Sequence, residues 1–588
     1  MPEKELEYLR TKEAAIGDDS SIDKNGGVYI DTFDQKPELK GFAKIIDGFK
    51  RADAGELGLD PNLSDIQKIA IMTANSPLSR SLKSRHLQMI AIGGAIGTGL
   101  FIGSGSTLGT GGPAGVIIAY AIIGTMIYCT VQSLGELAVT FPVSGAFITY
   151  NSRFIDPSWG FTMAWNYAMG WLIVLPLELV AAAITIKYWD ATTNSAAFVI
   201  IFYVIICSIN LFGVRGYGEA EFIFSLVKVL AILGYIILGI VLVAGGGPKG
   251  GYIGGKYFKN PGAFANGFKG VCSVFVTAAF AFGGTELCGL AAAETDNPRK
   301  AVPKATKQVF WRIALFYIIS LTLVGLLVPY NDPRLLVNGP VDAAASPFVL
   351  SIVDAGISGL PSVMNVVIMI SVLSVGNSSV YASSRTLAAL AVSGQAPKIL
   401  GYIDKEGRPI FGILLQCTFG LLCFITASND SGTVFDWLLA LSGLSSLFTW
   451  GSINMCLLRF RRALYVQGRT TDEVAFVSQV GVYGAIYGVT INVVVLIAQF
   501  WIALFPLGGS PNVSDFFMAY LGFPVVIVFY VFHKLWKRQW RIFIRAKDID
   551  IDTGRRELDL DILRQEIAEE KAYIASRPFY FRVWNFWC

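Results

Sequence analysis

Long apolar segments constrain this 588-residue chain more than any other feature of its sequence. A run of about 18 or more apolar residues is the signal of a membrane-spanning helix, and the chain has roughly twelve such runs. Hydrophobic residues make up 53% of the chain and charged residues only 15%, which excludes an ordinary soluble protein. The pattern predicts an all-α polytopic membrane protein. Its spans are expected at about 86–108, 113–140, 160–187, 196–214, 221–245, 270–292, 308–329, 362–391, 410–427, 433–458, 481–505 and 515–534.

Polar segments flank the apolar region and divide the chain into three parts. Residues 1–85 are expected to form a regulatory N-terminal tail, with a short helix near Asn62–Ile71 and no apolar core of the kind that a signal peptide needs. Residues 86–534 form the predicted twelve-helix domain, and 535–588 form a C-terminal tail. Within the domain, we expect a first repeat over 86–245, a second over 270–458, and spans eleven and twelve over 481–534.

Basic residues set the expected orientation of the spans. They gather in alternate loops and in both tails, whereas the opposite loops carry few apart from the connection before span six. Because positively charged loops stay in the cytoplasm, both tails are predicted to be cytoplasmic, in agreement with an even number of spans. The basic residues on that side include Lys83, Arg85, Arg215, Arg299, Lys300, Lys304, Lys307, Lys398, Lys405, Arg408, Arg459, Arg461, Arg462, Lys537, Arg538 and Arg541.

The first span, His86–Gly109, contains a glycine-rich run that is poor helix-forming sequence. Each glycine costs about 0.8–1 kcal/mol relative to alanine inside a helix, so the glycines from Gly93 to Gly99 favour an unwound segment. Irregular backbone at membrane depth is tolerated only where it lines a cavity or is buried in protein. The run therefore predicts a broken helix that exposes backbone N–H groups to a ligand. A packing face is the alternative, since Gly93 with Gly97 and Gly99 with Gly103 form small-residue pairs.

Span six contains a second interruption, Gly283-Gly284, directly after Phe280-Ala281-Phe282 and before Thr285-Glu286. Two glycine-interrupted helices at corresponding places are the sequence pointer to an inverted five-plus-five repeat with a binding site at the membrane midplane. The pairing of the two interruptions favours the ligand interpretation of span one.

The two interruptions together indicate a class of ligand. A half-helix that begins near Gly97–Gly99 presents free N–H groups and the positive end of its dipole, which suits a carboxylate. The break at Phe280–Gly283 leaves carbonyl oxygens without intrahelical donors, which suits an ammonium group. Both groups belong to an α-amino acid, so selectivity for its side chain is expected from spans three, six, eight and ten. The candidate substrate-binding residues are Ala95, Ile96, Gly97, Thr98, Gly99, Phe280, Ala281, Phe282, Gly283, Thr285 and Ser374.

Ionisable residues within the spans need a reason, because a charge at the bilayer centre costs about 2.5–3.5 kcal/mol on insertion scales. Glu286 is expected to carry a proton or sense substrate, with a structural hydrogen-bond acceptor as the alternative. Lys228 lies about 10 Å deep in span five. It either snorkels to the cytoplasm or is a cation in the place of a coupling Na⁺, which favours proton coupling. For Glu178, a gating role and a structural role are both consistent with the sequence.

Span eight carries a polar stripe that includes Ser374, Asn377, Ser378 and Tyr381. Substrate contact and hydrogen bonding between helices both explain such a stripe. Ser374 is kept as a substrate candidate, and Asn377 is kept with Glu178 as a gating or secondary residue.

Enzymatic chemistry is not indicated by any pattern in the chain. There is no nucleophile–base arrangement, and the glycines follow no strand as a dinucleotide fingerprint requires. Seven of the eight cysteines lie in apolar segments and show neither metal-ligand spacing nor an extracellular disulfide pattern. Neither a catalytic residue, a bound metal, a cofactor nor a nucleic-acid partner is expected.

A family resemblance is carried by RHLQMIAIGGAIGTGLFIGSG, QSLGELAVTFPVSGAF, FAFGGTEL with ETDNPRKAVPKA, and DWLLALSGLSSLFTWGSINMCLLRFRR. Over about residues 80–588 the chain resembles the fungal amino acid permeases of the amino acid–polyamine–organocation superfamily. Two further stretches, DIDTGRRELDLDILRQEIAEEKA and RVWNFWC, are similar to the general amino acid permeases of yeasts.

This resemblance implies a LeuT-like fold of twelve spans, proton symport and residence in the plasma membrane. It implies that Ala95–Gly99 is the carboxylate-binding loop and that Phe280–Gly283 is the amino-group and gate segment. Glu286 matches the acidic position of span six, and Lys228 matches the span-five lysine that stands in for sodium. Gly284 departs from the family pattern at a position where relatives vary, which bears on side-chain selectivity.

The tails carry their own expectations. Residues 557–574 predict an amphipathic helix against the inner face of the protein or the membrane, with a solvated tail helix as the alternative. An aromatic cluster after Pro578 is expected to hold Cys588 near the bilayer, where S-acylation is expected. By analogy with similar permeases, Lys12 and Lys24 are expected to be accessible to ubiquitin ligase machinery, and the protein is expected to traffic through the endoplasmic reticulum and endosomes.

The sequence thus predicts proton-coupled uptake of a broad range of L-amino acids by alternating access, with membrane lipids as further partners. One alternative is an amino acid permease of narrower specificity. The other is a non-transporting amino acid sensor with a permease fold.

Overall fold

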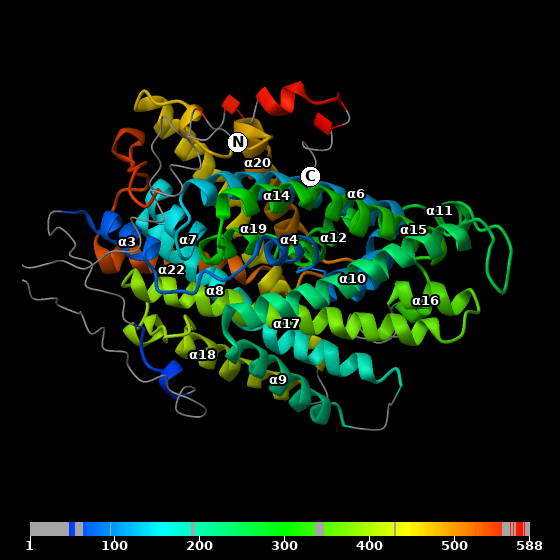
Figure 1. The fold of residues 1–588 in the computed structure, drawn as a ribbon. Coiled ribbons are helices and arrows are strands. Elements are labelled where there is room, and N and C mark those ends of the chain that lie inside the picture. Colours follow the sequence, from blue (N-terminus) through cyan, green and yellow to red (C-terminus); the bar gives the residue numbers. More distant parts are fainter. Residues whose placement is uncertain are drawn as a thin grey trace, which may run out of the picture. The chain divides into compact units, whose positions relative to one another are not determined.

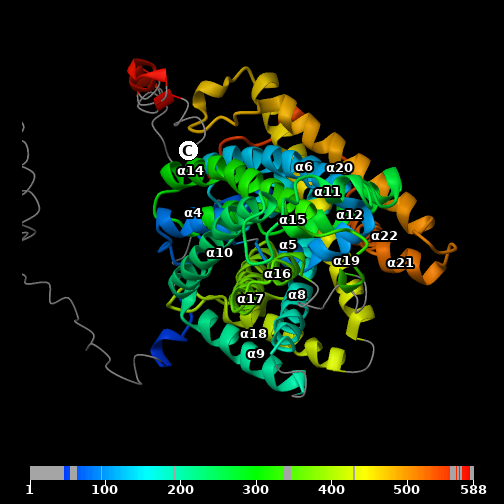
Figure 2. The same cartoon turned by 90° about the vertical axis from the view of Figure 1, so that its right-hand side faces the viewer.

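The computed structural model describes residues 46–52, 63–94, 96–189, 194–335, 346–427 and 431–555, together with 565, 568–569, 572–579 and 581–582. Its contacts divide the chain into two units, Met1–Lys50 and Arg51–Cys588. In the first unit, the described residues form a helical turn with an ion pair of 2.9 Å between Lys50 and Asp47. The helices labelled in Figures 1 and 2 belong to the second unit. The predicted sites that lie outside the described residues are Lys12, Lys24, Ala95, Cys588 and most of 557–574.

Seven helical segments within the described ranges are long and apolar enough to cross a membrane. They are α6 (Gly103–Thr140), α8 (Pro157–Ile186), α10 (Gly213–Val243), α12 to η2 (Gly267–Glu294), α14 to α15 (Pro298–Leu327), α17 (Leu360–Val392) and α20 (Gly481–Leu504). The other predicted spans correspond to α4 (Ser84–Gly93), α5 (Thr98–Phe101), α9 (Ser195–Leu211), α18 (Ile410–Gly420), α19 (Ser431–Val466), α21 (Val513–Tyr520) and α22 (Gly522–Lys537). The all-α polytopic fold is therefore confirmed.

Shorter elements join these helices or continue them. They are α3 (Asp65–Ala74), α7 (Phe147–Tyr150), η1 (Asn151–Ile155), α11 (Lys256–Lys259), α13 (Leu287–Leu290), η2 (Ala291–Glu294), η3 (Arg312–Ile319), α16 (Pro347–Asp354) and η7 (Leu421–Ala427). The helix containing span seven begins at Pro298, ten residues before the predicted start at 308, because polar residues continue it beyond the apolar run. Asn297 caps this start by accepting a hydrogen bond of 3.3 Å from the Lys300 N–H.

The element α6 combines the last residues of span one, from Gly103, with the whole of span two. Gly112 lies between them with φ +72°, a left-handed conformation that favours glycine. A Cβ atom at this position would lie 2.6 Å from the backbone nitrogen of Ala265. The Ala114 N–H donates to the carbonyl oxygen of Ala263 at 2.9 Å, so the turn is held by the segment that leads into α12.

Two helix pairs dominate the packing of the second unit: α17 lies along α8, and α12 lies along α6. The helix α10 packs against both α4 and α17, and the two views of the fold show it beside them (Figures 1 and 2). Large apolar side chains on α9 and α10 are exposed, among them Ile200, Val204, Leu230 and Ile237. Such surfaces suit contact with lipid rather than water.

Residues 63–85 fold against the ends of the spans. Ser64 caps α3 in a capping box with Gln67. The Ser144 N–H, before α7, donates to the carbonyl oxygen of Thr73 at 3.0 Å. Leu82 exchanges backbone hydrogen bonds with the end of span six, donating to Glu294 at 3.0 Å and accepting from Asp296 at 3.1 Å. We call this end of the helices the tail side.

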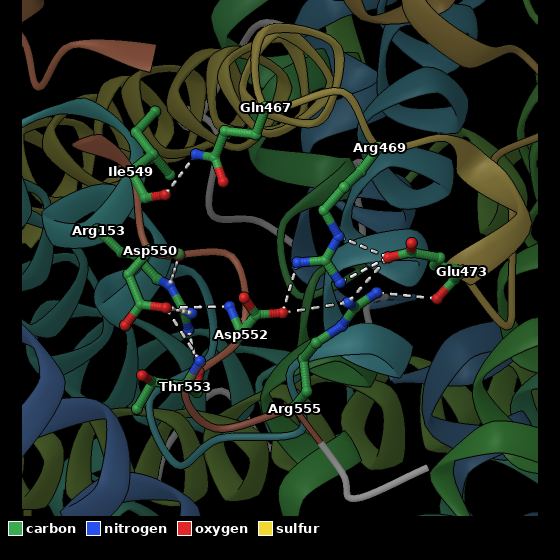
Figure 3. Close-up of polar contacts among 9 residues, drawn as sticks. All are labelled: Arg153, Gln467, Arg469, Glu473, Ile549, Asp550, Asp552, Thr553 and Arg555. Carbon is green, nitrogen blue, oxygen red and sulfur yellow. Dashed lines mark hydrogen bonds and ion pairs between the residues drawn. The ribbon is translucent and has the colours of Figure 1, made fainter. Parts of the chain in front are cut away.

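A segment after α22 also packs on the tail side, where it forms a polar cluster that we call the tail clasp (Figure 3). Arg153 of η1 donates to the carbonyl oxygens of Asp550 and Thr553 at 2.5 Å and lies 3.2 Å from the Asp550 carboxylate. Burial acts to raise the pKa of Asp550. The Arg153 guanidinium and hydrogen bonds from Thr553 and Asp552 outweigh it, so the pKa lies below its usual value.

The connection between α19 and α20 supplies the other half of the tail clasp. Arg469 pairs with Asp552 at 2.6 Å and with Glu473 at 2.5 Å, and Arg555 donates to the Glu473 carbonyl oxygen at 2.8 Å. Gln467 donates to the carbonyl oxygen of Ile549 at 2.8 Å. Residues far apart in the chain are thereby joined across the tail side (Figure 3).

Candidate functional site

The first predicted break is present at the junction of α4 and α5. Helix α4 ends at Gly93, and helical structure resumes at Thr98, so the N–H groups of Thr98 and Gly99 belong to a first turn that has no intrahelical acceptors. A Cβ atom at Gly99 would lie 2.5 Å from the Cα of Ala281, and one at Gly97 would lie 2.4 Å from a methyl group of Val375. The glycines therefore permit close approach as well as unwinding.

The second break lies between α12 and α13. Helix α12 ends at Phe282, and Gly284 follows with φ +87°, which favours glycine at this position. The carbonyl oxygen of Ala281 accepts a hydrogen bond of 2.6 Å from the Tyr317 hydroxyl, and that of Phe280 accepts one of 3.0 Å from the Gly283 N–H. Each carbonyl has two lone pairs and keeps capacity for a second donor.

A small cavity, with a volume of about 20 Å³, lies where the two breaks meet. That volume is far below the range of about 300–1,000 Å³ that is typical of small-molecule sites, so the walls must move apart to admit a ligand. Its walls come from spans one, three, six, eight and ten. The residues that line it are Gly97, Thr98, Gly99, Tyr167, Gly170, Trp171, Val174, Glu178, Phe280, Gly283, Val375, Ser442, Ser445 and Ser446.

Only part of the predicted substrate set faces this cavity. Gly97, Thr98, Gly99, Phe280 and Gly283 line it, whereas Ile96, Ala281, Phe282, Thr285 and Ser374 do not. Apart from Glu178, the wall residues of α8 and α19 were not singled out from the sequence. The spacing of Ser442, Ser445 and Ser446 places them on one helical face and is the signal that could have found them.

Glu178 is a buried carboxylate in the cavity wall. It accepts a hydrogen bond from the Thr98 hydroxyl, which ties α8 to the first break. Its other oxygen, Oε1, is buried and has no hydrogen-bond partner within the described part of the chain. The cavity therefore contains one carboxylate oxygen that can accept a bond from an ammonium group or bind a proton.

Glu286 lies beside the cavity rather than in its wall. Its carboxylate accepts hydrogen bonds from the Tyr167 hydroxyl at 3.2 Å, the Trp450 indole N–H at 3.1 Å and the Gly284 N–H at 3.3 Å. Glu286 thereby connects the second break to α8 and α19.

Lys228 points into the protein and does not snorkel. It is fully buried, and its ammonium donates to the carbonyl oxygen of Gly93 at 3.0 Å and to the Ser374 hydroxyl at 2.6 Å. The Glu221 carboxylate lies 3.8 Å away. Lys228 therefore places a positive charge directly on the end of α4, at the first break. Ser374 lies against this lysine, and Asn377 accepts a hydrogen bond of 2.9 Å from Asn210 on α9.

Three buried polar residues at the breaks were missed in the sequence. Glu221 precedes Lys228 by seven residues, a spacing that places both on one helical face and could have revealed the pair. Arg312 donates to the carbonyl oxygen of Ala91 at 2.9 Å, and Tyr317 links it to Ala281 in the second break. Arg312 could have been noticed as a charge within predicted span seven. No local pattern marks Tyr317, because its partner Ala281 lies on span six.

Two interrupted membrane helices that meet at a cavity define the class of secondary transporters. Comparison with known proteins identifies the family within this class. The profile of the amino acid permease family matches residues 86–546, and the chain belongs to that family. Its function is the transport of amino acids across a membrane, and it is not an enzyme.

Several fungal relatives are similar over most of their length. A general amino-acid permease of Candida albicans is 74% identical over 592 residues, covering 100% of both chains. One of Saccharomyces cerevisiae is 59% identical over 548 residues, covering 92% of this chain and 91% of the relative. A histidine permease of Saccharomyces cerevisiae is 52% identical over 522 residues, covering 87% of this chain and 86% of the relative.

Proposed function

We propose that the protein imports a broad range of L-amino acids, coupled to protons, across the plasma membrane. The observation that carries the proposal is the bond from the Lys228 ammonium to the Gly93 carbonyl oxygen at the first break. A fixed cation there takes the place of a coupling metal ion. Because the lysine can lose its proton, the coupling ion in this proposal is H⁺.

Substrate recognition is proposed to use groups that every α-amino acid shares. The N–H groups of Thr98 and Gly99 bind the carboxylate. The Phe280 carbonyl oxygen and the unpartnered oxygen of Glu178 bind the ammonium group. The rest of the wall combines serine hydroxyls with apolar surface from Trp171 and its neighbours, and this mixture supports a broad substrate range. Two relatives that are named general amino-acid permeases also support breadth.

Glu286 is proposed as a second coupling residue. A protonated carboxyl has fewer acceptor positions than a carboxylate. Protonation would therefore release Tyr167 or Trp450 and loosen the second break from α8 or α19. The alternative is a purely structural role, in which Glu286 accepts the same hydrogen bonds throughout transport.

The remaining parts of the proposal concern topology and the tails. By the positive-inside rule, the tail side faces the cytoplasm, and both termini lie there. Membrane lipids surround the spans, Cys588 is lipidated, and ubiquitin ligase machinery acts on the tails. These features are proposed together with trafficking through the endoplasmic reticulum and endosomes.

Uptake of radiolabelled L-leucine, L-aspartate and L-lysine into a permease-deficient yeast, with and without a protonophore, tests the proposal. We expect concentrative uptake of all three and its loss with the protonophore. Uptake of one class alone would favour the narrower permease, and accumulation that the protonophore leaves unchanged would exclude proton coupling. Failure to take up any of them would favour the sensor, provided that surface protein is present.

A further inference from the structure

The protein holds a second buried carboxylate next to Lys228 that the substrate cavity does not use. Glu221 lies on α10 and is fully buried. Ser374 of α17 donates to both of its oxygens, at 2.7 and 2.8 Å, and Ser225 donates to Oε1 at 3.3 Å. A buried carboxylate of this kind needs both a charge partner and hydrogen bonds, and Glu221 has both.

Hydrogen bonds around Ser374 form a directed chain. The Lys228 ammonium donates to the Ser374 oxygen at 2.6 Å, and the Ser374 hydroxyl donates to Glu221 at 2.7 Å. The ammonium and the carboxylate are themselves 3.8 Å apart, so the hydroxyl is the bridge between them. We propose that Ser374 and Glu221 form a relay that takes the coupling proton from Lys228. This inference rests on the proposed proton coupling.

The relay step moves no net charge out of the site. An N–H bond of Lys228 breaks as the Ser374 oxygen takes that proton, and the original Ser374 proton forms an O–H bond on Glu221. The products are a neutral amine, an unchanged serine and a carboxylic acid. A buried neutral pair avoids the desolvation of two charges, which makes the exchange accessible in the protein interior.

This transfer acts on the substrate site through one carbonyl group. A charge-assisted hydrogen bond is about twice as strong as a neutral one. When Lys228 becomes neutral, its bond to the Gly93 carbonyl oxygen weakens, and the first break is less firmly held. The protonation state of Lys228 thereby biases the backbone that binds the substrate carboxylate.

Facing hydroxyl groups continue from Glu221 toward the tail side. Ser378 lies 3.4 Å from the Glu221 carboxylate and 3.2 Å from the Tyr217 hydroxyl. Tyr217 lies eleven residues before Lys228 on α10, about 16 Å along the helix axis. Once Glu221 is protonated, it can donate to Ser378, which in turn can donate to Tyr217. The proposed topology places that direction toward the cytoplasm.

An ion pair lies at the tail-side end of this row of hydroxyl groups. Tyr217 stacks on Tyr381 with ring centroids 4.2 Å apart, and the Tyr381 hydroxyl donates to Glu294 at 3.0 Å. Arg385 pairs with Glu294 at 3.1 Å. Two other charged or titratable groups face the relay, Glu178 of α8 and Arg312 of η3. A third, His86 of α4, lies beside Gly218, which is one turn before Glu221 on α10.

Four single substitutions of the full chain test the relay. Glu221→Gln removes the proton acceptor, and Ser374→Ala removes the bridge but keeps both charges. Ser374→Thr keeps the hydroxyl. Glu219→Gln removes a carboxylate two residues away that is partly exposed and pairs with Arg85 and His86 instead. Each purified protein is reconstituted into vesicles with an internal pH dye, and radiolabelled L-leucine reports transport.

We expect Glu221→Gln and Ser374→Ala to lower pH-driven accumulation and proton influx per leucine at least tenfold. Leucine counterflow at equal pH should stay within threefold of the wild type. Ser374→Thr and Glu219→Gln should retain both activities. Equal loss of counterflow and accumulation in Glu221→Gln and Ser374→Ala would overturn the relay, and so would normal proton influx in both.

Failure of the proposed function has a different signature. If wild-type protein accumulates leucine without proton influx, proton coupling itself is absent. If the wild type is coupled and Ser374→Ala remains coupled, only the relay is wrong. Should Glu221→Gln fail to fold, as judged by size-exclusion chromatography, the Ser374→Ala and Ser374→Thr pair decides the outcome.

Discussion

The two helix breaks are held by titratable side chains of opposite sign. At the first, the Lys228 ammonium reaches from α10 to the carbonyl oxygen of Gly93. At the second, the Glu286 carboxylate accepts from the Gly284 N–H within the same span. The first break is therefore held by a side chain of a neighbouring helix, whereas the second is partly held by a side chain of its own span.

The surroundings of these two charges also differ. The Lys228 ammonium donates to the Ser374 hydroxyl, which in turn donates to Glu221, the proton acceptor of the proposed relay. Glu286 is bonded to the aromatic side chains Tyr167 and Trp450, which act as hydrogen-bond donors. Similar interruptions of the backbone thus have different neighbours. Under the proposed relay, the first break lies beside an acceptor for the Lys228 proton, whereas the second is hydrogen-bonded to α8 and α19.

Lys228→Met should produce the largest effect. It leaves Glu221 buried without a counter-charge, which typically costs about 3–5 kcal/mol in the free energy of unfolding. We expect a lower Tm in detergent and loss of concentrative uptake. The double variant Lys228→Met, Glu221→Gln should recover much of the Tm but not the uptake. A single variant with the wild-type Tm and uptake would remove the distinction between the breaks.

Gly99→Ala should have the next largest effect, because the breaks touch at this residue. The added Cβ would lie 2.5 Å from the Ala281 Cα, so backbone must move, at a typical cost of about 1–3 kcal/mol. We expect leucine uptake to fall at least tenfold with protein still at the surface. Gly234→Ala on α10 is the control, since nothing lies within 4 Å of its added Cβ. Unchanged uptake in Gly99→Ala would show that the breaks separate freely.

Glu286→Gln tests the second break directly. The amide keeps the shape of the side chain but carries no charge and has one acceptor oxygen instead of two. We expect concentrative uptake to fall about tenfold, equivalent to about 1.4 kcal/mol, and counterflow to fall less. Equal loss of the two activities would assign Glu286 a bracing role alone.

Tyr317→Phe should have the smallest effect. It removes the hydroxyl that donates to the Ala281 carbonyl oxygen at 2.6 Å, a bond worth about 0.5–1.5 kcal/mol. We expect a few-fold loss of uptake. Tyr235→Phe, which removes a buried hydroxyl bonded to Ser351 away from both breaks, should leave uptake unchanged. Similar losses in the two variants would mean that the effect is one of stability rather than of the break.

Much of the fold was predictable because its signals are local. The length of each apolar run predicts a span, and the glycines at Gly93–Gly99 and Gly283–Gly284 predict the breaks. Neither signal depends on tertiary contacts. Helix starts were less accurate, as at Pro298, because polar first turns continue a helix beyond its apolar run. The positions of Glu286 and Lys228 in the membrane interior were likewise visible as charges in apolar sequence.

The sequence by itself determined an all-α membrane protein with two interrupted spans and a family resemblance that comparison bears out. Only the tertiary structure decided which helical faces meet. It turned Ser374 toward Lys228 instead of the cavity, brought Glu221 to the same serine, and built the cavity wall from α8 and α19. Helical periodicity shows which residues share a face. The partner of that face depends on contacts between segments more than a hundred residues apart, which no local pattern records.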